Sequence, residues 1–167
     1  MGVVNTKSNR VTLAEAVPMR ADSSQLSAGV CKQIVATVAV AAADDDTSVF
    51  RLCRVHSSWT LPSCILFNDA LTSGTDWDLG LYQTAENGGA EVDKDVYADG
   101  FSLATASVVG VERAFGTRDI NKVENRVWQD AGLSADPGVF YDLCLTANTI
   151  GSAAGDITAI VSYVRPA

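Results

Sequence analysis

Histidine, methionine and long apolar runs are scarce in this chain. Its 167 residues include one histidine and two methionines, and the four cysteines form no C-x-x-C pair. A zinc or dithiol site usually needs several imidazoles or closely spaced thiolates, so the sequence offers no recognisable set of metal ligands. The longest apolar stretch, residues 34–43, is too short to cross a bilayer as a helix. We expect no metal, no cofactor and no membrane partner.

Positive charge is also in short supply. There are 12 Lys and Arg residues against 20 Asp and Glu, which gives a formal net charge of −8. A protein that binds nucleic acid neutralises phosphates with basic side chains, and anionic lipid surfaces attract the same side chains. We therefore expect no nucleic-acid partner. Hydrophobic residues make up 47% of the chain, which is enough for one sizeable core and excludes general disorder.

The four cysteines, Cys31, Cys53, Cys64 and Cys144, each lie inside an apolar run. This placement is typical of free, buried thiols. The first 25 residues hold no apolar segment of signal-peptide length, and the chain has no Asn-x-Ser/Thr acceptor. We expect a protein that is made in the cytoplasm and keeps its thiols reduced.

Two regions differ in composition. Residues 1–29 are rich in small and polar side chains without a sustained period, and they predict an N-terminal arm that orders on a partner or stays a mobile terminus. Residues 30–167 alternate apolar and polar positions and predict one β-sandwich domain. The expected strands cover residues 31–40, 48–55, 61–67, 77–82, 107–111, 141–146 and 156–164, whereas residues 92–101 are expected to be a loop or a short helix.

One helix is expected near residue 121. Asn121 and Glu124 have capping-box spacing, and Val123, Val127 and Trp128 share one helical face. Trp128 is predicted to plug one end of the sandwich with its ring buried. The fold prediction is all-β: an antiparallel β-sandwich, jelly-roll-like, with one short helix and an extended N-terminal arm.

Candidate catalytic residues gather around the single histidine. His56 has Cys53, Ser57 and Ser58 as neighbours in sequence, but no G-x-S-x-G nucleophile elbow occurs. We interpret His56 as an ordinary turn residue. With no catalytic constellation in view, the sequence predicts that the chain is not an enzyme and has no catalytic residues.

The acidic residues offer weaker alternatives. Asp44–Asp46 could attract calcium, and residues 93–100 begin like a calcium loop but place Tyr97 where an oxygen ligand belongs. The pairs Asp76/Asp78 and Asp93/Asp95 could form carboxylate pairs of the glycosidase kind. We interpret all of these as solvated loop acids.

Three tryptophans, Trp59, Trp77 and Trp128, could line a sugar-binding surface. Their expected positions on a turn, a strand and a helix favour packing in the core instead. The two interpretations differ in one observable, because a lectin would expose Trp59 or Trp77 as a platform.

Three groups of short motifs between residues 50 and 164 carry a family resemblance. The first group reads FRL, ILFNDAL and DWDLGLY at residues 50–52, 65–71 and 76–82. The second reads VYADG at residues 96–100. The third reads VWQDAGLSADPG, YDL, GDIT and VSYV at residues 127–138, 141–143, 155–158 and 161–164. In order and spacing, these motifs resemble the head decoration, or cement, proteins of tailed bacteriophages.

The resemblance implies a virion structural protein. Its partners would be the major capsid protein of the phage head and further copies of this chain, as a homodimer or homotrimer. It would lie on the head exterior and stabilise the capsid. The alternative is a carbohydrate- or receptor-binding β-sandwich module of a virion fibre or surface protein, and a small hydrolase is a third class.

Overall fold

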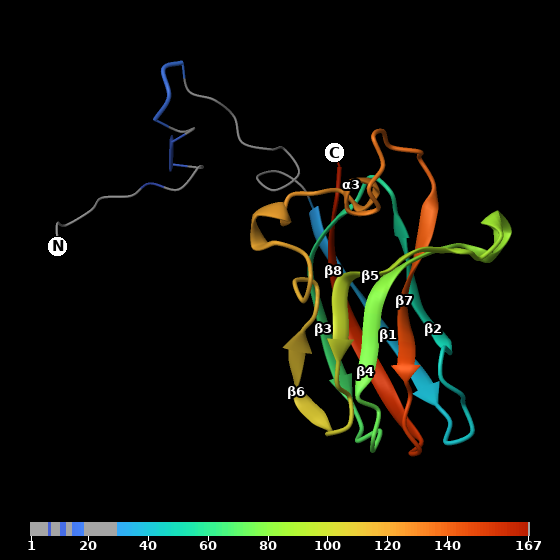
Figure 1. Ribbon diagram of the computed structural model, residues 1–167. Helices are drawn as coiled ribbons and strands as arrows, with labels where there is room; N and C mark the ends of the chain where they lie inside the picture. Colours follow the sequence, from blue (N-terminus) through green and yellow to red (C-terminus); the bar gives the residue numbers. More distant parts are fainter. Residues whose placement is uncertain (1–6, 8–10, 13–14, 19–29, 167) are drawn as a thin grey trace, which may run out of the picture.

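A computed structural model describes residues 7, 11–12, 15–18 and 30–166. Most of the predicted arm, residues 1–29, lies outside the described residues. Eight strands follow one another along the chain (Figure 1): β1 Val30–Val40, β2 Val49–His56, β3 Thr60–Asn68, β4 Asp76–Gln83, β5 Glu91–Phe101, β6 Ser107–Glu112, β7 Phe140–Thr149 and β8 Gly155–Arg165.

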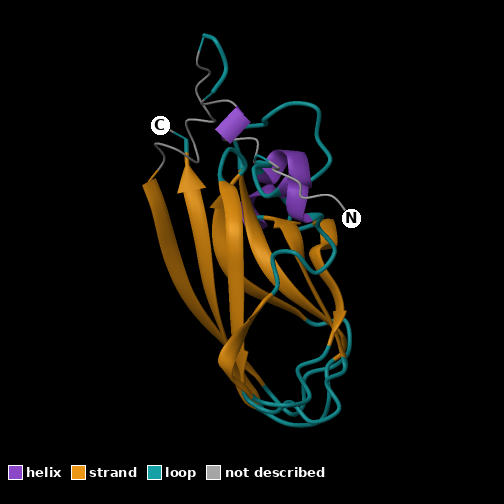
Figure 2. Cartoon of the chain, turned by 90° about the vertical axis from the view of Figure 1, so that its left-hand side faces the viewer, coloured by secondary structure: helices purple, strands orange, loops and turns teal. Residues whose placement is uncertain are grey.

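The strands form two four-stranded antiparallel sheets. The first sheet has the order β1-β8-β3-β6, and the second has the order β2-β7-β4-β5. Figure 2 shows the strands running side by side along the long axis of the molecule, with the helical segments at one end and loops at the other. The predicted all-β sandwich with one short α-helix is therefore confirmed.

The core lies between the two sheets and follows the predicted alternation. Ile157, Ala159 and Val161 of β8 are fully buried, whereas Thr158 and Ile160 between them are only half-buried. Strand β4 is buried on both sides, with Trp77, Leu79 and Leu81 at 0% exposure. Burying an alternating apolar face against the opposite sheet is the main stabilising contribution of such a sandwich.

The expectation of a loop or helix at residues 92–101 is wrong, because this segment belongs to strand β5. It pairs with β4, with register shifts at three points. Gly80 makes this pairing possible: a Cβ there would lie 2.2 Å from the carbonyl oxygen of Asp93. The close approach of the two backbones gives an acid-rich segment the neighbour it needs to form a strand.

The helix begins later than predicted. Residues Ile120–Lys122 form only a 3-10 turn (η2), and the α-helix α3 covers Val127–Asp130. The side chain of Gln129, not that of Glu124, accepts a bond from the backbone N–H at the helix start, that of Arg126, at 2.9 Å. The N–H of Val127 donates to the carbonyl of Trp59, so docking onto the turn after β2 sets where the helix starts.

The burial expected of Trp128 is only partial. Val127 is the fully buried residue of α3, whereas Trp128 is half-buried. The helix is a single turn, so only one of the two adjacent side chains faces the core. Another 3-10 turn, η1 at Ala85–Asn87, leads into the glycine pair between β4 and β5.

Four loops meet at the end of the sandwich away from α3, at residues 41–48, 69–75, 102–106 and 150–154. Backbone bonds link them: Leu71 N–H donates to Leu103, and Ser152 N–H donates to Thr72. The carboxylate of Asp46 accepts from the N–H of Ile150 at 2.9 Å. We call this the loop end, and we call the end that carries α3 the helix end.

Candidate functional site

The single histidine lies at the helix end, where β2 leaves the second sheet. His56 Nδ1 is 2.8 Å from the hydroxyl of Ser58, and the buried hydroxyl of Ser57 donates to Asp136. In a hydrolase triad the imidazole stands between the serine and the acid. Here Ser57 bonds the acid directly and also accepts from Val139 N–H at 3.2 Å. The structure brings these residues together as a turn anchor, without the triad geometry.

Electrostatics agree with a structural role for this corner. The hydrogen bond from Ser57 lowers the pKa of Asp136, which therefore stays an ionised acceptor. Burial, and to a lesser extent the charge of Asp142, raises the pKa of Cys53 to about 12. A thiol with that pKa is almost entirely protonated near neutral pH and is a poor nucleophile.

Aromatic rings surround the same corner. Trp59 stacks on Tyr163 with ring centroids 4.2 Å apart, and Phe140 meets His56 edge-on at 4.8 Å. The guanidinium of Arg165 lies 5.8 Å from the ring centroid of Trp59. His56, Trp59, Phe140 and Arg165 border a cavity of about 160 Å³, which is small for a drug-sized ligand.

None of the three tryptophans forms an exposed platform. Trp77 is fully buried and packs near Phe50, at 5.6 Å between centroids. Trp59 and Trp128 are half-buried. The expectation that these rings pack into the sandwich is confirmed for Trp77 and holds in part for the other two.

The acidic run after β1 supports a turn. Asp44 accepts from the N–H of Ala41 at 2.8 Å, and Asp46 accepts from Ile150. Residues 93–100 belong to strand β5, so the interpretation of Asp93 and Asp95 as solvated loop acids is wrong, and the calcium-loop alternative lacks the loop that it needs. Among the described residues, no group of three or more His, Cys, Asp or Glu side chains is arranged to hold a metal ion.

The Asp76/Asp78 pair is held together by neighbours. Asn148 donates to Asp76 at 3.1 Å and to Asp78 at 2.7 Å, and Lys94 Nζ lies 3.3 Å from Asp78. Burial alone would raise the pKa of Asp78, but hydrogen bonds from Gly100 N–H, Asn148 and Lys94 together outweigh it and lower that pKa. Asp78 is fully buried, so its interpretation as a solvated loop acid is wrong.

Two further acids lie next to this pair on β5. The charge of Asp78, then burial and the charges of other nearby acids, raises the pKa of Asp99. Burial and contact with Asp95 raise the pKa of Asp93. Lys94 of β5 and Asn148 of β7 contact the acids of β4 and each other, so this network links three neighbouring strands of the second sheet.

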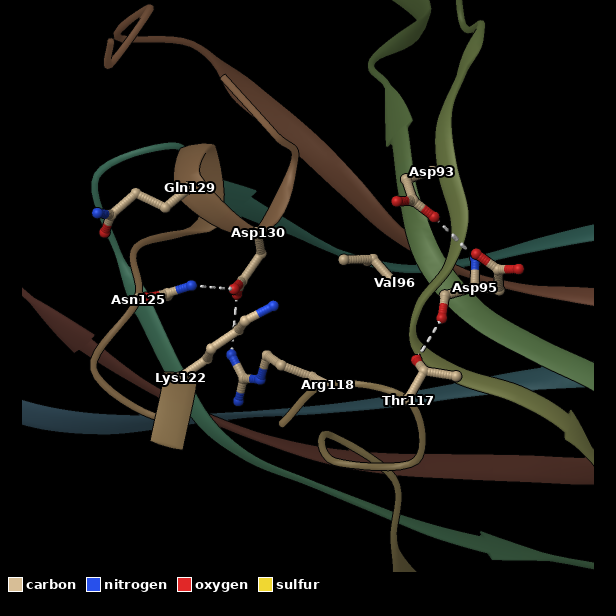
Figure 3. Close-up of a pocket in the computed structure, with 9 residues that line it drawn as sticks. All are labelled: Asp93, Asp95, Val96, Thr117, Arg118, Lys122, Asn125, Gln129 and Asp130. Atoms are coloured by element: carbon tan, nitrogen blue, oxygen red, sulfur yellow. Dashed lines mark hydrogen bonds and ion pairs between the residues drawn. The ribbon is translucent and has the colours of Figure 1, made fainter. Parts of the chain in front are cut away.

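A cavity of about 330 Å³ lies between β5 and α3 (Figure 3). Its floor is an ion pair between Arg118 and Asp130, 2.8 Å apart and 2% and 1% exposed. Arg118 also donates to the carbonyl of Leu61 at 2.7 Å, and Asn125 donates to Asp130 at 3.1 Å. These contacts fasten the irregular segment before α3 onto the sandwich. Sequence reasoning missed this pair.

The outer faces of the two sheets differ in charge along β1, β8 and β3, although β6 of the first sheet places Glu112 beside Ile65, where it accepts a hydrogen bond from Ser63. On the second sheet, Arg51 pairs with Asp142 at 2.7 Å, Arg54 pairs with Glu86 at 2.8 Å, and Lys94 pairs with Asp78. On the first sheet, the outward positions of β1, β8 and β3 between residues 33–37, 158–162 and 63–67 carry only uncharged side chains. We call this the neutral face; its residues are Gln33, Val35, Thr37, Ser63, Ile65, Phe67, Thr158, Ile160 and Ser162.

The loop end is acidic. Its four loops contain Asp44, Asp45, Asp46 and Asp69, and their sequences include no lysine or arginine. Asp156 at the start of β8 adds to the same end, where its N–H donates to Asp69 at 2.9 Å. The helix end carries charges of both signs. Lys32, near the start of β1, and Arg165, at the end of β8, both lie there because the two strands are antiparallel.

The four cysteines are all free thiols, as predicted, but they are not all buried. Cys31 is exposed because it points outward on β1, an edge strand of the first sheet. Burial raises the pKa of Cys144 to about 12 and raises that of Cys64 still further. The expectation of four buried thiols is therefore wrong for Cys31. Among the described residues, no helix is long and apolar enough to span a membrane.

Comparison with known proteins finds likeness in structure only. No family model and no curated protein sequence matches the chain. A chain of the solved structure "Capsid of Ralstonia phage GP4" matches with a TM-score of 0.61 and 11% identity. A chain of "Cyanophage Pam1 capsid asymmetric unit" matches with a TM-score of 0.53 and 17% identity. Each match covers 83% of this chain and 86% of the other. At these identities the shared property is the fold.

Proposed function

We propose that this chain is a structural protein of a phage virion that binds the outside of the assembled head and stabilises it. The observation that carries the proposal is the shared fold with chains from two phage capsids, matched over most of both chains. The motifs described above that resemble head decoration proteins point the same way. The near-equal coverage also means that the matched chains are about as long as this one.

The site geometry supports a structural role over an enzymatic one. Ser57, His56 and Asp136 lie together but hold a turn, and Lys94 pairs with the buried carboxylate of Asp78. We propose that the chain has no enzymatic activity. A sandwich whose loops are joined at one end and pinned by Arg118–Asp130 at the other suits a protein that stiffens a shell.

The proposed partners are the major capsid protein and other copies of the chain. The acidic loop end gives the chain one surface suited to a basic patch on a capsid partner. Residues 1–29 would reach to neighbouring subunits, since an extended residue advances about 3.3 Å. Small contacts repeated over many copies would add up to a large effect on the shell.

Co-sedimentation tests the proposal directly. Purified chain is mixed with heads assembled from the capsid protein encoded in the same genome, and the pellet is quantified. We expect binding that saturates at a fixed ratio to the capsid protein. Binding that never saturates, or that is absent, would contradict a decoration role.

Stabilisation is measured separately from binding. Heads with and without the chain are heated, or treated with a chelator, and DNA release is followed with an intercalating dye. Decorated heads should release DNA at the higher temperature. Equal release temperatures would contradict the stabilising role even if the chain binds.

The arm is tested by deleting residues 1–25. The deletion should leave a folded chain, because the described sandwich begins at Val30. Binding to heads should weaken. The circular dichroism spectrum of the shortened chain should still show the strand content of the full chain. If the shortened chain binds as tightly as the full chain, the arm does not contribute.

The sugar-binding alternative receives less support. A lectin platform requires an exposed aromatic face, but Trp77 is fully buried and Trp59 stacks on Tyr163. A glycan array decides between the two roles. Specific glycan binding that Trp59→Ala abolishes would favour the alternative over capsid decoration.

A further inference from the structure

The free edge of β1 differs from the other three sheet edges. The edge strands of the two sheets are β1, β6, β2 and β5. The pairings of β2, β5 and β6 each contain a register shift, whereas β1 pairs with β8 over 11 residues without one. Register shifts and short strands protect an edge from further pairing. A long, regular edge presents unpaired N–H and C=O groups to which another strand can add.

The inner face of β1 is open toward the helix end. Its inward side chains become more exposed along the strand: Val40 is 3% exposed, Ile34 is half-buried and Val30 is 61% exposed. The residue that pairs with Ile34 on β8, Val161, is fully buried. The core is therefore closed one strand in from the edge and open at the edge itself. An added strand would cover it, because alternate side chains of a strand point to one face.

The opposite side of the sandwich, between β5 and β6, is closed by the chain itself. Thr117 donates its N–H to the carbonyl of Tyr97 at 3.0 Å and its hydroxyl to the carbonyl of Asp95 at 2.6 Å. A Cβ on Gly116 would lie 2.6 Å from the Cβ of Ala98. Among the described residues, β1 pairs with β8 alone, so its outer edge has no such cover.

Two cations stand at the open end of this edge. Lys32 and Arg165 occupy inward positions, because they pair with Tyr163 and Val30 across β1 and β8. Among the described residues, neither cation forms an ion pair. A carboxylate on an added strand would be attracted to them. The edge therefore fits an extended segment with two apolar residues at alternate positions and an acid two positions further on, at the helix end.

The N-terminal arm contains a segment with this pattern. Val11, Leu13 and Glu15 stand at alternate positions. Outside the eight strands, no other segment of the sequence has two large apolar residues and an acid at this spacing. The pattern that the edge requires is therefore supplied by the chain itself.

We propose that the segment Val11–Glu15 of a neighbouring copy adds to the free edge of β1 as an antiparallel strand. Glu15 lies opposite Lys32, and Leu13 lies opposite Ile34 on the inner face. This inference rests on the proposed function, because it names the surface that the arm of a neighbouring subunit reaches. Backbone hydrogen bonds give the contact its affinity, and the inward side chains give it its register.

The conformation of the single chain favours a neighbour's edge over the chain's own. The N–H of Glu15 donates to the carbonyl of Val11 at 3.0 Å, and its carboxylate pairs with Lys7 at the surface. One helical turn and one exposed ion pair add little stability, so the segment can leave this turn when a free edge is near. The chain from Glu15 to Val30 spans about 50 Å when extended, which is longer than β1 at about 37 Å.

Disulfide trapping with the native, exposed Cys31 tests the inference. The register places Ala16 opposite Cys31, at a separation that a disulfide can bridge. Ala16→Cys in the full chain, oxidised mildly at about 100 µM, should give a covalent dimer joined between position 16 and Cys31. A non-reducing gel and mass spectrometry identify the product. Adding Cys31→Ser should abolish it.

Thr12→Cys is the matched control. Position 12 lies on the same face of the added strand but opposite Val35, about 13 Å along β1 from Cys31. This variant should give no more dimer than the wild type. Equal trapping at positions 12 and 16, or trapping at neither, overturns the inference.

Charge reversal tests the contact between Glu15 and Lys32. In the Ala16→Cys chain, Lys32→Glu places two carboxylates opposite each other and should slow trapping about threefold or more. Adding Glu15→Lys should restore the rate. Lys122→Glu changes the net charge equally in the η2 turn and should leave the rate unchanged. Slowing by both single changes would mean that net charge, rather than this contact, controls trapping.

The remaining outcomes separate this inference from the proposed function. A disulfide between position 16 and Cys31 of one chain, without a dimer, shows that each arm covers its own edge and overturns the assignment to a neighbour. A chain that saturates phage heads but is not trapped contradicts the strand addition alone. A chain that is trapped as a dimer but does not bind heads contradicts the proposed function alone.

Discussion

At the scale of single residues, the buried ion pair of Arg118 and Asp130 matters most for the stability of the helix end. Both side chains are almost fully buried, and Asp130 also accepts from Asn125. Removing one member of a buried pair leaves the other charge uncompensated, which is more damaging than never having had the pair. Stability at this end therefore depends on two charged groups in addition to the apolar burial of Val127.

Asp130→Asn should lower the free energy of unfolding by about 3–5 kcal/mol, because it leaves the Arg118 guanidinium buried without its counter-charge. Urea denaturation followed by tryptophan fluorescence measures the change. Glu86→Ala is the control, since it breaks the exposed pair with Arg54 and should leave the unfolding free energy nearly unchanged. A loss below about 1 kcal/mol in Asp130→Asn would contradict the role assigned to the pair.

We expect the folded chain to become more stable when the exposed carboxylate of Asp99 is neutralised. Its pKa is raised in the folded state by Asp78 and other nearby acids, so the ionised form disfavours folding at neutral pH. The penalty disappears as pH falls below the pKa of the unfolded chain, about 3.9. Asp99→Asn should therefore raise the melting temperature at pH 7, with a gain that shrinks toward pH 3. Glu124→Gln, at the helix end, serves as the control; an equal gain there would point to net charge instead.

The thiols should react in two classes. In dilute native protein, a disulfide-exchange reagent should label one thiol per chain, the exposed Cys31, while Cys53, Cys64 and Cys144 stay protected by burial and raised pKa. Four thiols should react after denaturation without a reductant. Cys31→Ser should abolish the native reaction. Fewer than four thiols in the denatured chain would reveal a disulfide.

At the scale of elements, the pairing of β4 and β5 depends on Gly80, which has no side chain. The backbone of Lys94 passes within 2.2 Å of where a Cβ on Gly80 would stand. A methyl group there forces the two strands apart. The hydrogen bonds of β5 and the burial of its partner strand would be lost together.

Gly80→Ala should therefore destabilise the chain by about 3 kcal/mol or more. Gly132→Ala is the matched control: no atom lies within 4 Å of the added group, and only its positive φ of 72° opposes the change, at a cost of about 1 kcal/mol. Chemical denaturation measures both, and amide exchange shows whether β5 opens first. Equal losses in the two variants would mean that the close approach at Gly80 relaxes freely.

The sequence predicts an element well where one face is buried and the other is not. The alternation of Ile157, Ala159 and Val161 was enough to place β8 and its inner face. The same reasoning failed for β5, because Asp93, Asp95 and Asp99 resemble a loop until β4 lies alongside. It also misplaced the helix, since contact with the turn after β2 overrides the local capping signal.

At the scale of the whole molecule, long-range contacts limit what sequence can predict about the candidate site. The uncharged outward positions around Val35 and Ile160 are visible in the sequence, but their meeting depends on a register between segments more than 100 residues apart. The Arg118–Asp130 pair joins an irregular segment to a short helix, and no periodic pattern marks such a contact. The β-sandwich could be predicted from the alternation of apolar and polar residues. Its surfaces could not, because they depend on which strands pair in three dimensions.

The path of the chain into and out of the sandwich has a practical consequence. Val30 and Arg165 face each other across β1 and β8, so the first and last strands begin and end at the helix end, opposite the four joined loops. A peptide or enzyme fused after the last strand would project from the helix end and leave the loop end uncovered. On a phage head decorated as proposed above, many copies would present the cargo in a regular, uniformly oriented array.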